Sequence, residues 1–428
     1  MILHKNFRLL VMGLALMVSR LSGAAISNYE DVIVGERASG MAGAFTAIAD
    51  DPSGMLYNPA GLVYAQDDYI SLSVNSFQSK TLIYKDIFPG KDYTLKSNAF
   101  IPAFFGFINK YDFGAVGFSV IVKDMQSFDQ NDRLEGLTQD PKGVYAINRQ
   151  FSLEAQRYLL GPSVAIPISS NLSVGLSLFA KYTKQKFLDA QLNVFNPGDA
   201  GPYILSTSYL NESTFAFEPR LGILYSPVDK VSIGLNLIQG FHLTGKGSSR
   251  VLVSQADKTD QTTPKIPVGK FNEDLALITQ DGFSQRDLLP FQASLGVAWY
   301  PSKDWLWAAD FRYYGADPAY LEMDAVATFN ASLGAEYYLD SRLPLRLGIF
   351  TNRAATPPVS QSSINQDTHI DFYGGSAGLS FVSPGSSLSM SFQYSTGSGE
   401  SQIISNTTAV QKVVGNQMSV FFSGAYQL

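Results

Sequence analysis

The chain contains no cysteine and few ionisable side chains. Among its 428 residues there are three histidines, 16% of the residues are charged, and the formal net charge is −6. Without cysteine, the protein has no disulfide bond, thiolate metal site, cysteine nucleophile or N-terminal lipid anchor. The acidic balance, with a pI near 5.2 and no basic run, argues against a nucleic-acid partner.

Long hydrophobic runs are also missing, except near the start of the chain. Lys5 and Arg8 precede an apolar run from Leu9 to Val18, and the small residues 22–25 follow it. This pattern predicts a secretory signal peptide over residues 1–25, because a membrane-spanning helix needs roughly 20 apolar residues. An exported chain without a spanning helix is expected to be either a secreted β protein or a membrane barrel.

What the chain has instead is period-2 alternation. In "NLSVGLSLFAKY" the even positions 172–182 carry aliphatic residues and a tyrosine, while most odd positions are small or polar. Such alternation is typical of strands with one apolar face. Fourteen segments are predicted to be strands: 68–78, 97–109, 112–124, 149–168, 171–187, 213–226, 230–244, 289–301, 304–316, 325–340, 343–353, 370–383, 386–396 and 416–428.

The apolar face of these strands is uniformly aliphatic or aromatic. Aromatic residues flank the short turns, among them Trp299, Trp305, Trp307, Tyr225 and Tyr337. An even strand number, with short turns alternating with long loops, favours a transmembrane barrel over a β-sandwich, whose polar face normally carries more charge. We therefore predict an all-β fold, a 14-stranded antiparallel transmembrane β-barrel over residues 68–428.

Residues 26–67 do not fit this strand pattern. They are rich in glycine and contain two Asx-Pro steps, Asp51-Pro52 and Asn58-Pro59, which favour helix and turn starts. A barrel of this size has a lumen too wide for wall side chains alone to fill. The segment is therefore predicted to be an N-terminal hatch, or plug, containing short helices and folded inside the barrel.

The stretch "GERASGMAGAFTAIADDPSGMLYNPAGL" resembles the N-terminal hatch of FadL-like long-chain fatty-acid and hydrocarbon transporters of Gram-negative outer membranes. The matching residues are Gly40, Gly43, Ala47, Ala49, Asp50, Asp51 and the triplet Asn58, Pro59, Ala60. "LPLRLGIFTNR", "DFYGGSAGLSF" and "LSMSFQYSTG" are similar to the late strands of that family.

The resemblance implies a transporter in the bacterial outer membrane. Its ligands would be hydrophobic small molecules, most of all long-chain fatty acids, and its surroundings outer-membrane lipid and lipopolysaccharide. The ligand would be captured in an apolar groove among extracellular loops, enter the plugged barrel and leave sideways through the wall near a kinked third strand. We expect a monomer with no cofactor and no metal. A similar hatch occurs in some barrels that act in secretion, so a secretion-associated or structural barrel is the alternative.

Two regions are candidates for this route. In the predicted third strand, Gly114 and Gly117 are the expected bend sites of a lateral gate, although both can instead make room for hatch side chains. In the loop 245–288, a short helix near 272–281 would line the capture groove, or would pack only within its own loop. Its groove residues would be Phe271, Leu275 and Ile278.

Inward-facing charges form the last group of candidates. By strand parity they are Arg157, Lys181, Glu218, Arg220, Asp310, Arg312, Glu336 and Arg346. They can brace the wall and hatch as ion pairs, or leave a cation free for a carboxylate headgroup. A headgroup site would use Arg220, Arg312 and Lys181, with Phe179 and Phe350 as apolar lining. No serine motif accompanies His242 or His369, so no enzyme is predicted.

Overall fold

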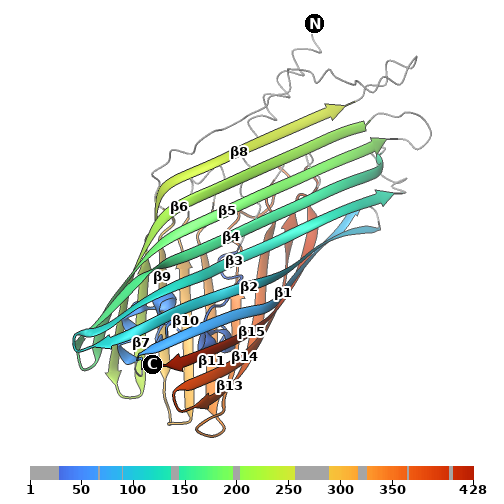
Figure 1. Ribbon diagram of the computed structural model, residues 1–428. Helices are drawn as coiled ribbons and strands as arrows, with labels where there is room; N and C mark the ends of the chain where they lie inside the picture. Colours follow the sequence, from blue (N-terminus) through green and yellow to red (C-terminus); the bar gives the residue numbers. More distant parts are fainter. Residues whose placement is uncertain are drawn as a thin grey trace, which may run out of the picture.

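The computed structural model describes the chain from residue 28 onward. The described residues are 28–65, 68–88, 90–135, 144–195, 203–255, 289–316, 325–363, 366–403 and 408–428. They form a closed β-barrel with the N-terminal segment inside its lower part (Figure 1). The predicted signal peptide lies outside the described residues.

Short helices in the described residues belong to the N-terminal segment 28–65, called the hatch below. Two α-helices, α2 (Glu36–Gly40) and α3 (Gly54–Tyr57), precede the 3-10 helix η2 (Pro59–Tyr64). Within the described part of the chain, no helix is long and apolar enough to cross a membrane.

The wall consists of antiparallel strands. In the described residues these are β1 (Tyr69–Phe88), β2 (Lys91–Tyr111), β3 (Gly114–Glu135), β4 (Val144–Ser169), β5 (Leu172–Phe195), β6 (Tyr203–Val228), β7 (Val231–Ile238), β8 (Phe241–Gln255), β9 (Gln292–Trp299), β10 (Trp305–Tyr314), β11 (Thr328–Tyr338), β12 (Pro344–Asn352), β13 (His369–Ser383), β14 (Ser386–Ser401) and β15 (Gln411–Gln427). Pairing of β1 with β15 and of β5 with β6 completes the ring.

The predicted strand 230–244 is β7 and β8 together. Both pair with β6, and they are interrupted only at Gln239 and Gly240. They therefore share one position in the wall, and the predicted 14-stranded barrel is confirmed.

The two ends of the barrel differ. The connections after β2, β4, β6, β9, β11 and β13 are short. Tyr69 at the start of β1 pairs with Gln427 at the end of β15, which places the C-terminus at the same end (Figure 1). We call this the turn end, and the opposite end the loop end.

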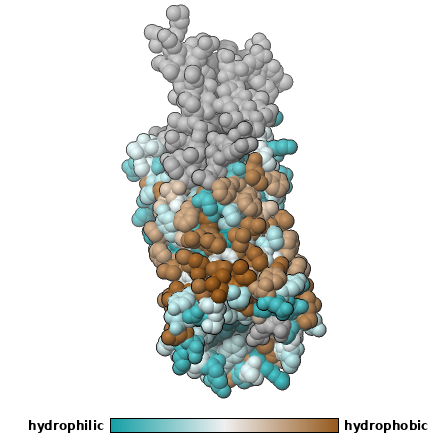
Figure 2. All heavy atoms as spheres, turned by 90° about the vertical axis from the view of Figure 1, so that its left-hand side faces the viewer, coloured by the Kyte–Doolittle hydropathy of each residue, from teal (hydrophilic) through white to brown (hydrophobic). Residues whose placement is uncertain are grey.

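The outward face is apolar in the part of the wall nearer the turn end. Leu333, Leu347 and Ile349 on β11 and β12 are each more than half exposed. Figure 2 shows hydrophobic residues gathered in a band across one face, with hydrophilic residues below them at the turn end. Such a band is typical of a transmembrane barrel.

Aromatic side chains border this band. Near the turn end, the Trp305 ring lies 5.6 Å from that of Trp307 and 4.5 Å from that of Tyr337. Toward the loop end, Tyr182 lies 6.2 Å from Tyr158 and 4.8 Å from Phe215. Two such aromatic rows are expected at the two interfaces of a bilayer.

Several strands are longer than predicted because they continue past the apolar band. β3 extends to Glu135, whereas the alternation predicted an end at residue 124. In this extension the polarity is reversed: Phe128 is buried inside, while Ser127 and Asp129 face outward and are exposed. About 10 residues of a tilted strand cross a bilayer, so the loop-end halves of β3–β6 exceed what a membrane requires.

Candidate functional site

Two Asx-Pro steps shape the hatch, as the sequence predicted. Asp51 Oδ1 accepts hydrogen bonds from the backbone N–H and the hydroxyl of Ser53, at 2.7 and 2.6 Å. Asn58 caps η2, since its Oδ1 accepts a hydrogen bond from the Ala60 N–H at 3.2 Å with Pro59 in the first turn. Burial raises the pKa of Asp51 to about 6, although the hydrogen bond from Ser53 opposes this shift.

Asn58 also joins the hatch to the wall. Its side chain is fully buried, and Nδ2 donates to the carbonyl oxygens of Thr46 at 2.8 Å and of Ile223 on β6 at 3.0 Å. Gly222 lies beside it, and a Cβ at that position would collide with Asn58 Oδ1. The fit between this asparagine and a wall glycine fixes the position of η2.

The motif glycines of the hatch face wall arginines. A Cβ on Gly40 would lie 2.9 Å from the Cβ of Arg346. Gly43 has a φ of 78°, which favours glycine, and its carbonyl accepts a hydrogen bond from Arg312 Nη2. Both positions therefore bring the hatch backbone close to the wall.

Buried ion pairs brace the hatch. Glu336 on β11 accepts from Arg37 of α2 at 2.8 Å and from Arg346 on β12 at 2.6 Å. Arg37 also pairs with Asp50 of the hatch at 2.6 Å. One wall carboxylate thus holds a hatch arginine and a wall arginine together.

The three cations predicted for a headgroup all have partners. Arg312 pairs with Glu30 of the hatch at 2.8 Å and with Asp310 at 3.2 Å. Arg220 donates to the carbonyl of Leu56 at 2.6 Å, and both Arg220 and Lys181 pair with Glu218, at 2.5 and 3.2 Å. These contacts favour the bracing alternative at these positions, and a headgroup role for them stays a prediction.

The two residues predicted as apolar lining lie in different apolar clusters. Phe179 is fully buried against the hatch, and the Arg220 guanidinium lies 5.5 Å from its ring centre. Phe350 packs in a separate cluster that includes Met41 and Phe45 of the hatch. The predicted groove residues Phe271, Leu275 and Ile278 lie outside the described residues.

Two apolar clusters follow one another along the lumen. The upper apolar cluster lies toward the loop end and includes Tyr84, Tyr93, Leu95, Phe128, Phe151, Leu153, Phe187, Phe372 and Val413. The lower apolar cluster joins the hatch to β2–β5 and β15 and includes Val32, Val34, Met55, Leu62, Ile101, Phe104, Ile121, Val122, Leu159 and Phe421.

A polar belt separates these clusters, and Asp31 of the hatch is its centre. The Asp31 carboxylate accepts from Lys80 Nζ at 3.0 Å, from Gln126 at 2.7 Å and from Asn352 at 2.9 Å. Its carbonyl accepts from Gln417 at 2.7 Å. In the described residues, no group of three or more His, Asp or Glu side chains is arranged to hold a metal ion.

The wall is interrupted between β2 and β3, beside the lower apolar cluster. Ser97 pairs with Phe128 and Phe104 with Ile121, but no pairing joins residues 98–103 to residues 122–127, all of which are described. On the other side of β3, the register shifts between Val122 and Asp124, leaving Lys123 unpaired. The described ladder between β2 and β3 is therefore continuous only from Phe104 toward the turn end, and Ser97 with Phe128 forms a single pair beyond the break.

The predicted bend residues Gly114 and Gly117 lie elsewhere on β3. Gly114 begins the strand at the turn end, with a φ of 146°. Gly117 pairs regularly with Ile108 and Ser163, and a Cβ there would lie 2.8 Å from the Met55 side chain of the hatch. The irregularity of β3 lies at Lys123, and Gly117 makes room for the hatch.

A small cavity lies between the hatch and the wall. Its volume is about 60 Å³, and cations outnumber anions in its lining: Lys123, Arg220 and Arg312 face Glu30. In the described part of the chain, the Lys123 ammonium forms no ion pair within 4 Å, and Arg220 Nε has no hydrogen-bond acceptor. The cavity is thus electropositive beside the wall break.

Comparison with known proteins shows the fold. No family model matches the sequence, and no curated protein is significantly similar to it. A structure of a Pseudomonas aeruginosa FadL homologue matches with a TM-score of 0.63 and 12% identity, over 94% of this chain and 99% of that one. The chain has the FadL-like fold.

Two further FadL-like structures match over the same 94% of the chain. The Ralstonia pickettii toluene transporter TbuX has a TM-score of 0.59 at 14% identity and is covered completely, at 100%. The CymD monoaromatic hydrocarbon channel has a TM-score of 0.58 at 15% identity and is covered to 99%. At these identities the similarity establishes the FadL-like barrel and its hatch, while the chemistry of the lumen has to be judged from this chain's own residues.

Proposed function

We propose that the protein is an outer-membrane transporter for the uptake of hydrophobic small molecules, with long-chain fatty acids as the substrate class. The observation that carries the proposal is the break between β2 and β3. It begins at Val122, which pairs with Tyr158 of the loop-end aromatic row, and it is backed by the lower apolar cluster, so an apolar ligand can pass there from the lumen to the edge of the apolar band. An open aqueous pore would give such a ligand no apolar surface to bind.

The proposed route begins among the loops and enters the upper apolar cluster. Aromatic and aliphatic side chains of β1–β6, β13 and β15 converge there. Each buried CH₂ of a long acyl chain contributes about 0.8 kcal/mol, so this region can hold a lipophilic molecule drawn from water. The polar belt around Asp31 is the next barrier.

The hatch has to move for a ligand to pass. Ligand pockets are typically about 300–1,000 Å³, whereas the cavity beneath the belt has about 60 Å³. The structure therefore corresponds to a closed state in this proposal. Release of Asp31 from Lys80 and Gln126 would connect the two apolar clusters.

The electropositive cavity favours a ligand with an anionic headgroup. Lys123 stands at the break itself and has no ion-pair partner in the described residues, so a carboxylate can bind it without displacing an existing pair. The similar structures include a toluene transporter and a monoaromatic hydrocarbon channel, whose named substrates are uncharged. Lys123 is therefore the residue that distinguishes the two ligand classes in this chain.

Uptake by cells tests the function and the ligand class together. Cells lacking the protein should accumulate labelled oleate more slowly than cells that express it. Lys123→Met should slow oleate uptake at least fivefold and leave toluene uptake unchanged, while Lys303→Met, at an exposed turn-end position, should affect neither. Equal oleate uptake with and without the protein would refute transport and leave the secretion-associated or structural barrel.

A disulfide across the break tests the lateral exit separately. Continuing the register on either side places Phe100 opposite Met125, and the chain has no native cysteine to interfere. Oxidised Phe100→Cys/Met125→Cys should block uptake, and reduction should restore it. The control is Asn109→Cys/Val116→Cys, which bridges a regular pair of the same strands. Normal uptake through a closed break would refute lateral exit.

A further inference from the structure

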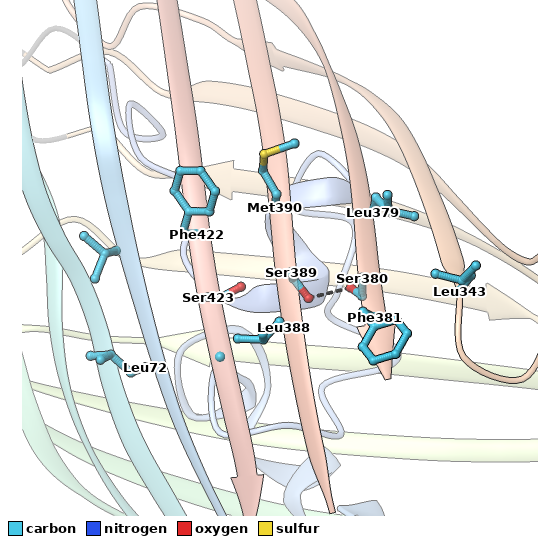
Figure 3. A pocket seen from close by; sticks show the side chains of 12 residues that line it. Leu72, Leu343, Leu379, Ser380, Phe381, Leu388, Ser389, Met390, Phe422 and Ser423 are labelled. Carbon is cyan, nitrogen blue, oxygen red and sulfur yellow. Dashed lines mark hydrogen bonds between the residues drawn. The ribbon is translucent and has the colours of Figure 1, made fainter. Parts of the chain in front are cut away.

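An apolar groove lies on the outer face of the barrel, away from the lumen and the break. It has a volume of about 520 Å³. Figure 3 shows its side chains, which come from β1, β13, β14 and β15 and from the connection before β12. The bulky members of the lining are Leu72, Leu343, Leu379, Phe381, Leu388, Met390 and Phe422.

The groove exists because one outward position lacks a side chain. Gly424 on β15 pairs with Leu72 on β1 and with Leu388 on β14, and Leu388 in turn pairs with Phe381 on β13. A row of large outward residues is thus interrupted by a glycine, which forms part of the floor. A Cβ on Gly424 would lie 3.7 Å from the Ser387 carbonyl oxygen, an ordinary contact, and 3.3 Å from the Leu388 Cδ2, so only the end of that flexible side chain has to shift slightly.

The position of the groove indicates its membrane depth. Phe381 and Leu388 lie within a few residues of the turn at Gly385, at the turn end. In the membrane orientation of the proposed function, this is the periplasmic leaflet. Its hydrocarbon consists of lipid acyl chains, and an apolar groove of this size can hold one of them.

A cation stands at the turn-end rim of the groove. The carbonyl of Arg342 accepts a hydrogen bond from the Val382 N–H at 2.8 Å, next to Phe381, and Arg342 directly precedes Leu343 of the lining. The Arg342 side chain is exposed and forms no ion pair in the described residues. An arginine at the membrane interface is well suited to bind a lipid phosphate.

We propose that the groove is a specific phospholipid site, with one acyl chain along Gly424 and the phosphate on Arg342. The proposal rests on the membrane placement given above, but not on transport of any ligand. A resident lipid would fill the interrupted row of outward side chains and complete the packing of β13, β14, β15 and β1. The site is distinct from the uptake route, because the wall separates it from the hatch.

Native mass spectrometry tests this proposal. Delipidated full-length protein in detergent is titrated with dioleoyl phosphatidylglycerol, and the first bound lipid is quantified. Gly424→Leu should fill the groove and Arg342→Gln should remove the phosphate partner, and each should weaken the first binding step at least tenfold. Heat-modifiable gel migration confirms that every variant is a folded barrel.

Matched controls separate a site from the general lipid coat. Gly375→Leu changes another wall glycine, whose Cβ would meet only the Gly348 carbonyl oxygen at 3.3 Å and an Ile349 methyl at 4.0 Å. Lys303→Gln removes a cation from a different turn-end connection. Both should bind like wild type. Equal binding by all five proteins would overturn the proposal, as would a dimer that Gly424→Leu dissociates without any change in lipid binding.

Because uptake is not a readout of this experiment, its outcome is independent of the transport test. Lipid binding at Gly424 and Arg342 with no uptake would leave the site intact and refute only the proposed function.

Discussion

Replacement of Asn58 by alanine should loosen the hatch without unfolding the barrel. The substitution removes the cap of η2, which costs about 1 kcal/mol. It also leaves the carbonyl oxygens of Thr46 and Ile223 without their donor, at about 1 kcal/mol each. The sum, about 3 kcal/mol, corresponds to a roughly 100-fold increase in the population of the locally open hatch.

Hydrogen exchange measures this opening directly. The Ala60 N–H donates to the Asn58 side chain and the Gly61 N–H donates to the Asn58 carbonyl at 3.0 Å, so both amides report on η2. Their protection should fall roughly 100-fold in Asn58→Ala, while the wall strands exchange as in wild type. Asn416→Ala is the control, because Asn416 accepts only a wall contact, from Tyr394 at 3.1 Å. Unchanged protection of η2 would refute the anchoring role derived for Asn58.

Three further changes test the same closed hatch by the same measurement. Glu336→Gln should lower the free energy of local opening of α2 by about 3–5 kcal/mol, the cost of removing one partner from a buried pair. Asp189→Asn, which breaks a wall pair with Arg149, should leave the opening of α2 unchanged. Gly222→Ala should reproduce the Asn58 effect, because its Cβ would collide with Oδ1. The pKa of Asp51 in the folded protein, about 6, lies above its ordinary value of 3.8, so the folded hatch binds a proton more tightly than the open one. The protection of α3 from exchange should therefore increase as the pH falls from 6 toward 4. Asp51→Asn should abolish this pH dependence. A constant protection of α3 over that range would contradict the burial of this carboxylate.

Alternation predicted the barrel because the bilayer imposes one rule on every strand. Where the outside is hydrocarbon, outward residues are apolar, and this pattern located all fourteen wall positions. The rule ends at the aromatic row that contains Tyr158 and Tyr182. Beyond it, β3–β6 have water outside and the upper apolar cluster inside, so the polarity reverses. A search for outward apolar faces therefore stopped too early on β3.

The contacts of the hatch were less accessible to sequence reasoning. Parity identified the inward charges, but it could not tell that Arg220 binds a hatch carbonyl or that Glu336 holds two arginines. Those assignments depend on the path of the hatch through the lumen, which no periodicity encodes. The register shift of β3 at Lys123 did leave a signal in the sequence: Lys123 and Asp124 are consecutive charges that end the apolar run of this strand. Two adjacent charges cannot both face the lumen of a regular strand, so a bulge was implied there.

Separate anchors hold the two parts of the hatch, and these anchors limit how it can move. Residues 36–60 are held by Glu336 through Arg37, by serines of β14 through Glu36, and by Asn58. Residues 28–34 are held by the polar belt through Asp31, by Arg312 and Tyr314 through Glu30, and by wall carbonyls through Asn28.

One buried carboxylate beside this segment lacks hydrogen-bond partners within the described part of the chain. The Asp124 carboxylate at the wall break is 3% exposed and accepts no hydrogen bond in the described residues. An unsatisfied buried acceptor costs about 1–3 kcal/mol, which offsets part of the free energy of the belt. In the proposed transport, an opening by withdrawal of residues 28–34 has to release both Asp31 and Glu30, and it removes Val32 and Val34 from the lower apolar cluster while residues 36–60 stay in place.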